Sequence, residues 1–319
     1  MWKKIFGKSA TKKNEVTPVD IERSRLPRHV AVIMDGNGRW AKGQGFLRTV
    51  GHRAGVDTLH DILDTAIDLK LEVLTVYAFS TENWKRPHDE VDFLMRLFSE
   101  YLDKEEREMH EKNVRIRFIG RVDELTPELI RRVRHAEELM KNNTGVHFCV
   151  AVNYGGQDEI CRVVQGLAEK VQAGELSPEE ITPELFQASL DTKELPPVDL
   201  VIRTSGDMRL SNFLLWQAAY AEFWFTETNW PDFKPERFME ALRDYAGRER
   251  KASGTGFSQR TSESSAGTSS SRTRMRTLRA TSSPLRSSRG SGSVRPRRAD
   301  SSTMERSERS GSSVRRLKI

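Results

Sequence analysis

Six short apolar segments, separated by longer segments of helical periodicity, constrain the fold of this 319-residue chain most strongly. Short apolar runs of this kind are typical of strands buried on both faces, and such strands belong to parallel sheets. Strands that alternate with helices predict a single α/β domain whose central, mostly parallel sheet is surrounded by helices. The expected strands are His29–Met34, Glu72–Phe79, Val114–Ile119, Val146–Val152, Asp199–Ile202 and Phe223–Thr226.

Helical periodicity is clearest in two of the intervening segments. Apolar residues recur at helical spacing from Val56 to Ile67. Val91–Leu102 carries large apolar residues around much of its circumference, whereas a surface helix would show one stripe. We expect this second helix to line a hydrophobic tunnel on one side, although simple core packing explains its composition equally well. A capping hydroxyl before proline predicts further helix starts at Thr126, Ser177 and Thr182.

The C-terminal part of the chain differs in composition from the rest. Residues 253–319 contain 20 serines, 15 basic residues and 4 acidic residues, a net charge of +11, and one aromatic residue, Phe257. Such a segment cannot bury enough apolar surface to offset its chain entropy, so we expect it to be disordered. Residues 1–252 carry a net charge of −5. The basic pI of the whole chain is therefore no argument for nucleic-acid binding.

Cysteine usage and the N-terminus bear on the cellular setting. Cys149 and Cys161 show neither a metal-ligand spacing nor a disulfide framework, which favours a reduced, cytoplasmic protein. No apolar run approaches the roughly 20 residues that span a bilayer, and the N-terminus lacks the apolar core of a signal peptide. Trp2, Ile5 and Phe6 fit the apolar face of a weak membrane-surface anchor, but a frayed terminus is the simpler interpretation.

A polar stretch follows the first expected strand, where α/β proteins bind their ligands. It contains Asp35, Gly36, Asn37, Gly38 and Arg39. The glycines let backbone N–H groups approach a ligand closely, and the guanidinium suits phosphate. One acid among anion-binding groups is explained if a divalent cation bridges it to a diphosphate. Taken alone, the stretch is explained equally well as a tight turn.

Three further polar clusters fall at strand ends or at a helix start. Arg48, His52 and Arg53 begin the helix after the first strand, where free N–H groups favour an anion, although solvation of the helix start is an alternative. The segment after the second strand contains Ser80, Thr81, Glu82, Asn83, Trp84 and Arg86. The segment after Asp199–Ile202 contains Arg203, Arg209 and Ser211. Because the carboxyl ends of parallel strands share one edge, these clusters predict a site for one or two polyanionic groups.

Four motifs together resemble those of the cis-prenyltransferases, and most closely those of bacterial undecaprenyl diphosphate synthases. They are H-V-A-V-I-M-D-G-N-G-R-W-A from His29, G-H-R-A-G from Gly51, S-T-E-N-W-K-R-P from Ser80 and D-L-V-I-R-T-S-G-D-M-R-L-S-N-F-L-L-W-Q from Asp199. The resemblance covers residues 26–250. The trans-prenyltransferases use D-D-x-x-D motifs instead, and this chain contains no Asp-Asp pair.

The resemblance implies an enzyme that condenses isopentenyl diphosphate repeatedly onto farnesyl diphosphate with cis geometry. The expected product is a long-chain polyprenyl diphosphate, in bacteria the C55 undecaprenyl diphosphate that serves as lipid carrier for cell-wall synthesis. It also implies Mg²⁺ as cofactor and a homodimer. We therefore divide the chain into a flexible basic segment (1–25), a catalytic domain (26–252) and the Ser/Arg-rich tail (253–319). We expect a cytoplasmic protein without a nucleic-acid partner. Peripheral contact with the inner membrane is compatible with this expectation.

The resemblance also assigns roles to individual residues. Asp35 is a catalytic residue and a Mg²⁺ ligand, and Glu222 matches the second metal position. The backbone from Gly36 to Arg39 holds the allylic diphosphate, with Arg48 and His52 close by, whereas Arg203, Arg209 and Ser211 bind isopentenyl diphosphate. The other substrate-binding positions are Trp40, Ser80, Thr81, Glu82, Trp84, Arg86 and Leu210. Taken by itself, Glu222 is better interpreted as a carboxylate beside aromatic residues at a sheet edge.

Asn83 is the family's candidate for removing the proton from the condensed intermediate. An amide is a poor general base. A diphosphate oxygen, or a water molecule oriented by Asn83, is therefore at least as good a candidate for the proton acceptor.

The chain departs from the family pattern in two places. Asp207 and Met208 stand where relatives often have glutamate and a polar residue. The family also ends in a segment like R-x-R-R-F-G-G, whereas this chain has Ala252 and Ser253 at the aromatic and first glycine positions. The tail that follows fits a shifted reading frame, a fused segment or a basic appendage attracted to anionic lipid.

Two other functions deserve comparison with the enzymatic one. A non-catalytic subunit of the family would not need the residues Asp35, Asn83, Arg203, Arg209 and Glu222, all of which are present. An RNA- or membrane-binding adaptor driven by the tail is disfavoured by the acidic domain and by the lack of aromatic residues among the tail's arginines.

Overall fold

The computed structural model describes residues 21–248, so the predicted disorder of residues 253–319 and most of the N-terminal segment lie outside the described residues. Six parallel strands form one sheet in the order β3-β4-β2-β1-β5-β6. They are β1 His29–Ile33, β2 Val73–Ser80, β3 Arg115–Ile119, β4 His147–Tyr154, β5 Leu200–Arg203 and β6 Glu222–Phe225. All six predicted strands are confirmed, and their ends shift by one or two residues at most.

The helices alternate with the strands as predicted, except that β6 follows β5 without a helix between them. The α-helices are α1 Asn37–Gly43, α2 Arg48–Asp68, α3 His88–Glu111, α4 Pro127–Met140, α5 Gly156–Gln172, α6 Pro183–Gln187 and α7 Pro235–Gly247. Short 3-10 helices are η1 Arg23–Arg25, η2 Thr81–Lys85, η3 Val122–Glu124, η4 Pro178–Glu180 and η5 Trp230–Asp232. The hydroxyls of Thr126 and Thr182 cap α4 and α6 as expected, whereas Ser177 begins only the 3-10 turn η4.

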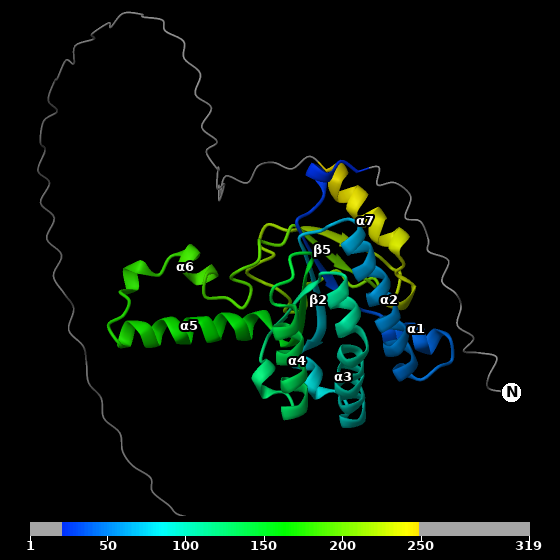
Figure 1. Cartoon of the computed structure of the whole chain (residues 1–319), viewed down its shortest axis with the longest axis horizontal. Coiled ribbons are helices and arrows are strands. Elements are labelled where there is room, and N and C mark those ends of the chain that lie inside the picture. The colour runs from blue at the N-terminus through cyan, green and yellow to red at the C-terminus, as the bar shows by residue number, and fades with distance from the viewer. Residues whose placement is uncertain (1–20, 249–319) are drawn as a thin grey trace, which may run out of the picture. The chain divides into compact units, whose positions relative to one another are not determined.

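The two faces of the sheet are covered differently. Val30 and Val32 of β1 point into a core shared with α2, α3, α4 and α7, which pack on one face (Figure 1). Ala31 and Ile33 point to the other face, because side chains alternate along a strand. That face is covered mainly by irregular segments between residues 195 and 221, so the helical layer is less complete than predicted. Helices α5 and α6 project away from the sheet and pack in a small cluster of their own (Figure 1).

The order of the strands reverses at β1, which lies between β2 and β5. In sheets of this kind, ligands bind beyond the carboxyl ends of the strands at such a switch point. Ile33 of β1 pairs with Arg203 of β5, so the segments after these strands leave the sheet side by side. The topology therefore places Asp35 next to Arg203.

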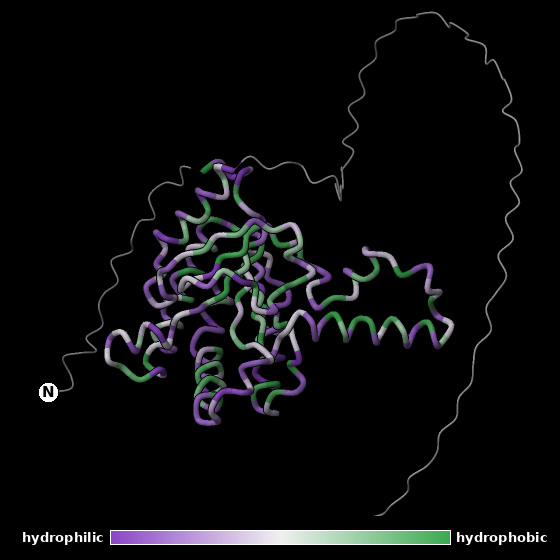
Figure 2. The backbone as a smooth tube through the Cα atoms, turned by 180° about the vertical axis from the view of Figure 1, so that it is seen from behind, coloured by the Kyte–Doolittle hydropathy of each residue, from purple (hydrophilic) through white to green (hydrophobic). Residues whose placement is uncertain are grey.

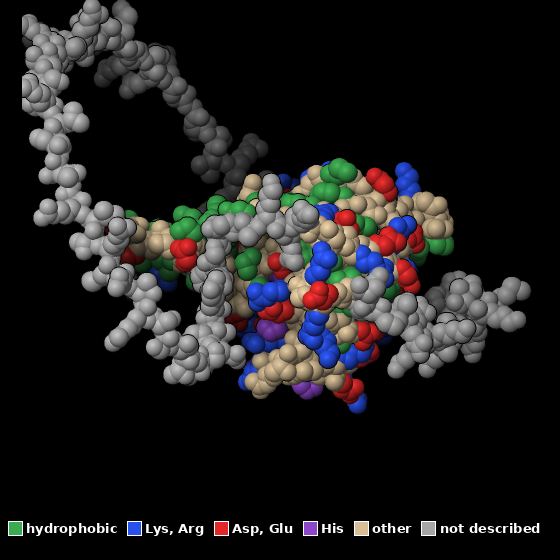
Figure 3. Space-filling view, turned by 90° about the horizontal axis from the view of Figure 1, so that it is seen from above, with side chains coloured by type: hydrophobic (Ala, Val, Ile, Leu, Met, Phe, Trp, Pro, Cys, Tyr) green, Lys and Arg blue, Asp and Glu red, His purple; other side chains and the backbone are tan. Residues whose placement is uncertain are grey.

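Charged side chains are intermixed on the surface of the domain. Acidic and basic groups alternate on the visible part of the face in Figure 3, and many form ion pairs such as Arg28–Glu72 at 2.7 Å. Within residues 21–248, no helix combines the length and the apolar character needed to cross a membrane.

His29 gives the fold a defined pH dependence. The imidazole is fully buried, with Nδ1 2.8 Å from the Pro196 carbonyl oxygen and Nε2 2.7 Å from Thr75 Oγ1. Burial lowers the pKa of His29 from 6.5 to about 4. The pKa of His29 is lower in the folded than in the unfolded protein, so burying the neutral imidazole stabilises the fold relative to acidic conditions. This stabilisation is complete above the unfolded pKa and is lost as the pH falls towards the folded pKa.

We expect the free energy of unfolding of the native chain to fall by about 2 kcal/mol more than that of His29→Gln between about pH 7.5 and about pH 5. Urea unfolding at both pH values measures the difference, since glutamine keeps hydrogen-bonding groups but does not titrate. If the free energy of unfolding falls equally in both proteins, folding does not lower the pKa of His29, and His29 is protonated in the folded protein at its ordinary pKa.

Candidate active site

Asp35 lies just past β1 and contacts two of the arginines that were predicted to bind substrate. Its Oδ1 accepts a hydrogen bond from Gly36 N at 2.7 Å, and its Oδ2 lies 3.0 Å from both Arg39 Nη2 and Arg203 Nη2. The Thr204 hydroxyl accepts from Asp35 N and donates to Asp35 O, which fixes the backbone. The structure therefore brings together the acid and the arginines that follow β1 and β5.

Gly36 makes this arrangement possible. It adopts φ of 103°, and a Cβ here would lie 2.5 Å from Asn229 Oδ1 and 2.6 Å from Ser205 Oγ. Only glycine tolerates both the backbone conformation and the close approach. Helix α1 can thus begin immediately after Asp35, so that Arg39, one turn later, returns to the carboxylate.

Arg203 is a buried cation with several partners. Its side chain is 4% exposed, and its Nη1 donates to Arg209 O and to Ser211 Oγ, the latter at 2.7 Å. Its Nη2 contacts Asp35 and, at 3.4 Å, Asp207. Its Nε is buried and has no hydrogen-bond partner within residues 21–248. A buried guanidinium needs partners for all its donors, so the orphan donor indicates a place for a ligand oxygen.

Asp207 is a site residue that the sequence reasoning missed. Its carboxylate lies 2.9 Å from Arg209 Nη1 and 3.2 Å from Arg39 Nη2, besides its contact with Arg203. Burial opposes ionisation, but the charge of Arg209, a hydrogen bond with Asp35 and the charge of Arg203 together hold the pKa of Asp207 below its usual value. Two carboxylates and three guanidinium groups therefore form one compact cluster.

The segment after β5 has an unusual backbone. Positive φ angles occur at Ser205, Gly206, Ser211, Asn212 and Leu214. For residues other than glycine such angles cost energy and tend to persist at functional sites. The strain lies in the loop that carries Asp207, Arg209 and Ser211, which supports a functional role for its shape.

Two arginines and a histidine surround Glu90 of α3. Arg86 Nη1 lies 3.0 Å from Oε1 of Glu90, Arg48 Nη1 lies 3.1 Å from its Oε2, and His52 Nε2 lies 3.6 Å from its Oε1. Burial, then the charge of Arg86, lowers the pKa of His52, so its imidazole is mainly neutral at pH 7. Three predicted substrate-binding residues converge here, although Glu90 itself was not predicted. Arg48 also lies against Gly38, which joins this group to α1.

The segment after β2 folds into η2 through a local cap. Asn83 Oδ1 accepts a hydrogen bond from Ser80 N at 3.1 Å, and the Ser80 hydroxyl accepts from the Asn83 backbone. The amide oxygen of Asn83 is therefore already engaged within its own segment.

The remaining residues of η2 contact neighbouring strand ends. Thr81 opens the helix, Glu82 Oε1 accepts from Asn212 Nδ2 at 2.8 Å, and Trp84 Nε1 donates to Asn153 Oδ1 at 2.8 Å. These contacts connect η2 to the loop after β5 and to the end of β4. The carboxyl ends of β1, β2 and β5 thus contribute to one region, as predicted, and the end of β4, which was not predicted, adds Asn153.

Two predicted substrate-binding residues lie at its border. Trp40 Nε1 donates to Asp232 Oδ1 at 2.9 Å, so the indole faces η5 rather than Asp35. Leu210 is partly buried against the core on the second face of the sheet.

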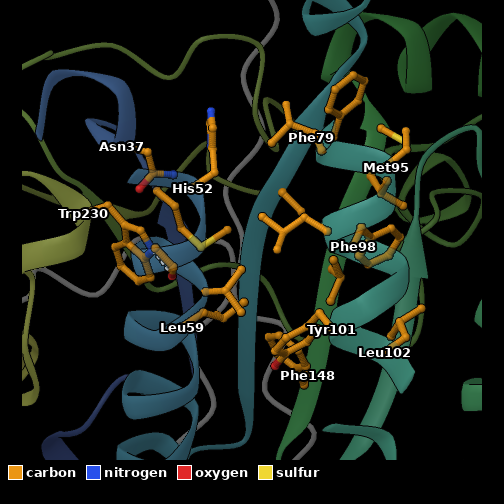
Figure 4. A pocket seen from close by; sticks show the side chains of 18 residues that line it. Asn37, His52, Leu59, Phe79, Met95, Phe98, Tyr101, Leu102, Phe148 and Trp230 are labelled. Atoms are coloured by element: carbon orange, nitrogen blue, oxygen red, sulfur yellow. Dashed lines mark hydrogen bonds between the residues drawn. The ribbon is translucent and has the colours of Figure 1, made fainter. Parts of the chain in front are cut away.

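An apolar pocket lies beside the charged cluster, between α2, α3 and the sheet (Figure 4). Asn37 and His52 form its polar end, and Tyr101 and Phe148 lie together at the opposite end (Figure 4). The α3 residues that line it are Leu94, Met95, Leu97, Phe98, Tyr101 and Leu102. Helix α3 therefore lines an apolar pocket on one side, whereas a tunnel for a growing product stays a prediction. Asn37 Oδ1 and Tyr101 Oη, one near each end, are both buried and find no hydrogen-bond partner in the described part of the chain.

Glu222 does not join Asp35 within one chain. It begins β6 and pairs with Leu200, at the amino end of the sheet, whereas Asp35 follows the carboxyl end. Its Oε2 lies 2.6 Å from Arg248 Nη1. The predicted pair of metal ligands is therefore not assembled within a single chain, because the register of parallel strands separates the two carboxylates along the strand direction.

Another group of potential ligands occurs on α2 and α3. Donor atoms of His60, Asp64 and Glu108 lie within 4.8 Å of one another. However, Lys112 Nζ lies 2.5 Å from Asp64 Oδ1 and 2.7 Å from Glu108 Oε1, so an ammonium group already neutralises these carboxylates. This group is remote from the strand ends and is better explained as a network of ion pairs.

Comparison with known proteins agrees with this geometry. Residues 33–253 match the family model described as putative undecaprenyl diphosphate synthase. The chain is 49% identical over 239 residues to an isoprenyl transferase of Rhodopirellula baltica, covering 75% of this chain and 98% of that protein. It is 48% identical over 244 residues to a ditrans,polycis-undecaprenyl-diphosphate synthase, (2E,6E)-farnesyl-diphosphate specific, of Yersinia pseudotuberculosis, covering 75% and 97% respectively.

Solved structures show the same relationship. Lavandulyl diphosphate synthase from Lavandula x intermedia, in complex with dimethylallyl diphosphate, superposes with a TM-score of 0.70 at 37% identity, covering 72% of this chain and 98% of that one. A probable undecaprenyl diphosphate synthase from Campylobacter jejuni gives a TM-score of 0.59 at 34% identity, covering 70% and 97%.

Proposed function

The chain belongs to the undecaprenyl diphosphate synthase family of cis-prenyltransferases, and we propose that it condenses isopentenyl diphosphate repeatedly onto farnesyl diphosphate. The product is a long-chain polyprenyl diphosphate, C55 undecaprenyl diphosphate in our proposal, which serves as lipid carrier for cell-wall synthesis. One observation carries the proposal most directly. The cluster of Asp35, Asp207, Arg39, Arg203 and Arg209 lies beside an apolar pocket, which suits a substrate with a diphosphate head and a prenyl tail.

The residues around Asp35 fit a magnesium ion. Mg²⁺ prefers carboxylate oxygens together with substrate phosphates, and Asp35 and Asp207 present neighbouring carboxylates to one region. Asp207 rather than Glu222 is the second carboxylate that a single chain supplies. When bound, the ion would neutralise charge that develops on the departing diphosphate.

The chain's own residues position the two substrates. Backbone groups from Gly36 to Arg39 and the side chains around Glu90, namely Arg48, His52 and Arg86, hold the allylic diphosphate at the polar end of the pocket. Arg203, Arg209 and Ser211 hold isopentenyl diphosphate. The carbon–oxygen bond of the allylic substrate breaks, its diphosphate leaves with the electron pair, and the double bond of isopentenyl diphosphate attacks the exposed carbon. Arginines aimed at the leaving group stabilise its negative charge.

The condensed cation then loses a proton to restore a double bond. Asn83 is a poor base, and its amide oxygen already accepts from Ser80 N. We therefore assign the proton to a diphosphate oxygen or to a water molecule oriented by Asn83. The other η2 residues, Thr81, Glu82 and Trp84, shape the substrate region from the β2 side.

We include a homodimer in the proposal. β6 is an edge strand of the sheet, and its residues Phe223, Trp224 and Phe225 are only half-buried. Exposed aromatic edge strands are usually covered, and a second copy of the chain is the simplest cover. Glu222 begins this strand, so its predicted role in metal binding belongs to the assembled dimer. Cytoplasmic localisation and peripheral contact with membrane lipid complete the proposal.

Turnover of radiolabelled isopentenyl diphosphate with farnesyl diphosphate and Mg²⁺ tests the proposed function. We expect chain extension to discrete long products. Binding of both diphosphates without any extension would instead identify a non-catalytic member of the family.

Substitutions of the arginines should separate the two substrate sites. Arg203→Ala and Arg209→Ala should each raise the KM for isopentenyl diphosphate about tenfold or more, because each removes charge-assisted hydrogen bonds, and should affect farnesyl diphosphate less. Arg39→Ala should show the reverse preference. Arg53→Ala is the matched control, since Arg53 pairs with Glu100 at 3.0 Å outside the cluster. Equal losses for both substrates in all three site variants would contradict two separate sites.

A further inference from the structure

The connection between α1 and α2 projects from the domain. We call residues 42–50 the α1–α2 tip. It stands out from the body of the domain in Figure 1, and Figure 2 shows an apolar stretch at its outer end. Residues 42–48 are exposed without interruption. At Gly43 and Gly45 an added Cβ would meet nothing within 4 Å, so no other described part of the chain covers the tip there.

The tip exposes large apolar side chains. Leu47 is 77% exposed, Phe46 is 53% exposed and Val50 is 41% exposed. A single exposed leucine needs no explanation, but three neighbouring apolar residues at a projecting turn indicate an interaction surface. Hydrogen bonds hold the turn in shape, with Phe46 N donating to Ala41 O at 2.8 Å and Gly45 N donating to Lys42 O at 3.1 Å. The apolar residues are therefore displayed by a defined backbone conformation.

Positive charge surrounds these apolar residues. Residues 36–56 contain no aspartate or glutamate and include Arg39, Lys42, Arg48 and Arg53. Lys42 is exposed, and the side chains of Arg48 and Arg53 remain 65% and 56% exposed although each contacts a glutamate of α3. Aromatic and leucine side chains flanked by cations are typical of segments that insert shallowly into anionic bilayers.

The two helices that flank the tip also supply the polar end of the pocket. The same stretch of chain supplies Asn37 from α1 and His52 and Gly55 from α2 to the pocket wall. We propose that the α1–α2 tip docks on the surface of an anionic lipid bilayer and inserts Phe46 and Leu47 among the lipid chains. This inference rests on the proposed function, since an enzyme with a long-chain polyprenyl product benefits from a membrane beside the pocket that releases it.

An anionic bilayer explains the tip better than a protein partner does. The apolar patch is small and convex, and its flanking charges share one sign over 21 consecutive residues, 36–56. A two-fold contact of the tip with the tip of a second copy would place these like charges against each other. A negatively charged lipid surface attracts the exposed Lys42, Arg48 and Arg53 together.

Vesicle partition of the full chain measures the docking without substrate, so it stays independent of the turnover assay. We expect vesicles that contain phosphatidylglycerol to bind the native chain about tenfold or more tightly than the double variant Phe46→Ser/Leu47→Ser. Val164→Ser is the matched control, because Val164 is 53% exposed on α5, far along the chain from the tip. The basic tail is identical in all three proteins. Equal binding of the native chain and the double variant would overturn the proposal.

A fluorescent label reports insertion directly. Leu47→Cys in a Cys161→Ser background is labelled with an environment-sensitive dye, while Cys149 is buried and remains unlabelled. We expect a blue shift on anionic vesicles and none on phosphatidylcholine vesicles. The exposed Cys161 of the native chain, labelled in the same way, should show no shift. A dye at position 47 that shifts with protein concentration and without vesicles would identify a contact between copies of the chain and overturn membrane docking.

Discussion

Asp35→Asn should lower the rate of prenyl transfer about a thousandfold, comparable to the loss of one stabilising group at a developing anion. Asparagine keeps the shape of the side chain but removes the charge that faces Arg39, Arg203 and the cation site. The fold should persist, because Arg203 retains Asp207 and its bonds to Arg209 O and Ser211. Single-turnover rates at saturating substrate and Mg²⁺, measured beside thermal unfolding, separate the two effects.

Glu100→Gln serves as the control for Asp35→Asn, since Glu100 also pairs with an arginine but lies outside the site. It should retain the native rate. Asp207→Asn provides the internal comparison, because Asp207 contacts the same arginines. A native rate in folded Asp35→Asn together with a large loss in Asp207→Asn would transfer the role of the essential carboxylate to Asp207.

The strands were predictable because buried parallel strands leave a strong local signal. Five of six are nearly continuous runs of apolar residues, and the core positions Val30 and Val32 have no exposed surface. The end of each strand then predicted where polar side chains would gather. Asp35 and Arg203 meet as expected, since adjacent parallel strands in register must release their following segments at one edge.

Residues that act through a long-range contact were not predictable in the same way. Glu90 sits within the first turn of α3, where an acidic residue is ordinary, and only the packing of α3 beside α2 brings it to Arg48 and His52. The position of Asp207, three residues after Thr204 at a strand end, could have indicated a site residue. Asp207 was treated only as a departure from the family pattern. Glu222 lies at the start of β6, at the opposite end of the sheet from Asp35, so its predicted role in metal binding depends on a second copy of the chain and stays a prediction.

The covering of the second face of the sheet could not be predicted from the sequence either. Strands buried on both faces predict two covering layers but do not say what covers them. The segments that cover Ala31 and Ile33, around Leu195, Val198 and Phe213, have no helical periodicity to report. These irregular segments are held in place by packing against the sheet, and the local pattern of apolar residues does not predict such long-range packing.

Tyr101→Ala should lengthen the polyprenyl products. The ring of Tyr101 lies with Phe148 at the end of the pocket remote from Asn37 and His52 (Figure 4), so a growing chain that starts at the diphosphate site reaches it last. Tyr101 is 7% exposed, and its hydroxyl has no partner among the described residues, which indicates that the ring fills space rather than anchoring a hydrogen bond. Removing the ring opens room at the closed end. Mass spectrometry of the extracted products measures the shift in chain length.

The extension should nevertheless be limited, because the layer behind Tyr101 is charged. Burial, then the charges of Glu105 and Asp64, raises the pKa of the Tyr101 phenol above its usual value, so acidic groups lie close behind it. Glu105 is itself buried and pairs with His60 at 3.1 Å. An apolar chain would have to desolvate this pair to continue, which is unfavourable. We therefore expect a modest lengthening rather than unlimited growth.

Tyr101→Phe separates the ring from the hydroxyl. It keeps the end of the pocket closed and removes a buried donor that lacks a partner, so product length should stay native while the free energy of unfolding stays equal or rises by about 1 kcal/mol. Tyr101→Ala should lose about 3–5 kcal/mol of stability, as buried aromatic truncations do, so products must be compared at a temperature where it is folded. If folded Tyr101→Ala gives native products, the end of the pocket is set elsewhere. If Tyr101→Phe changes them, the hydroxyl rather than the ring limits the chain.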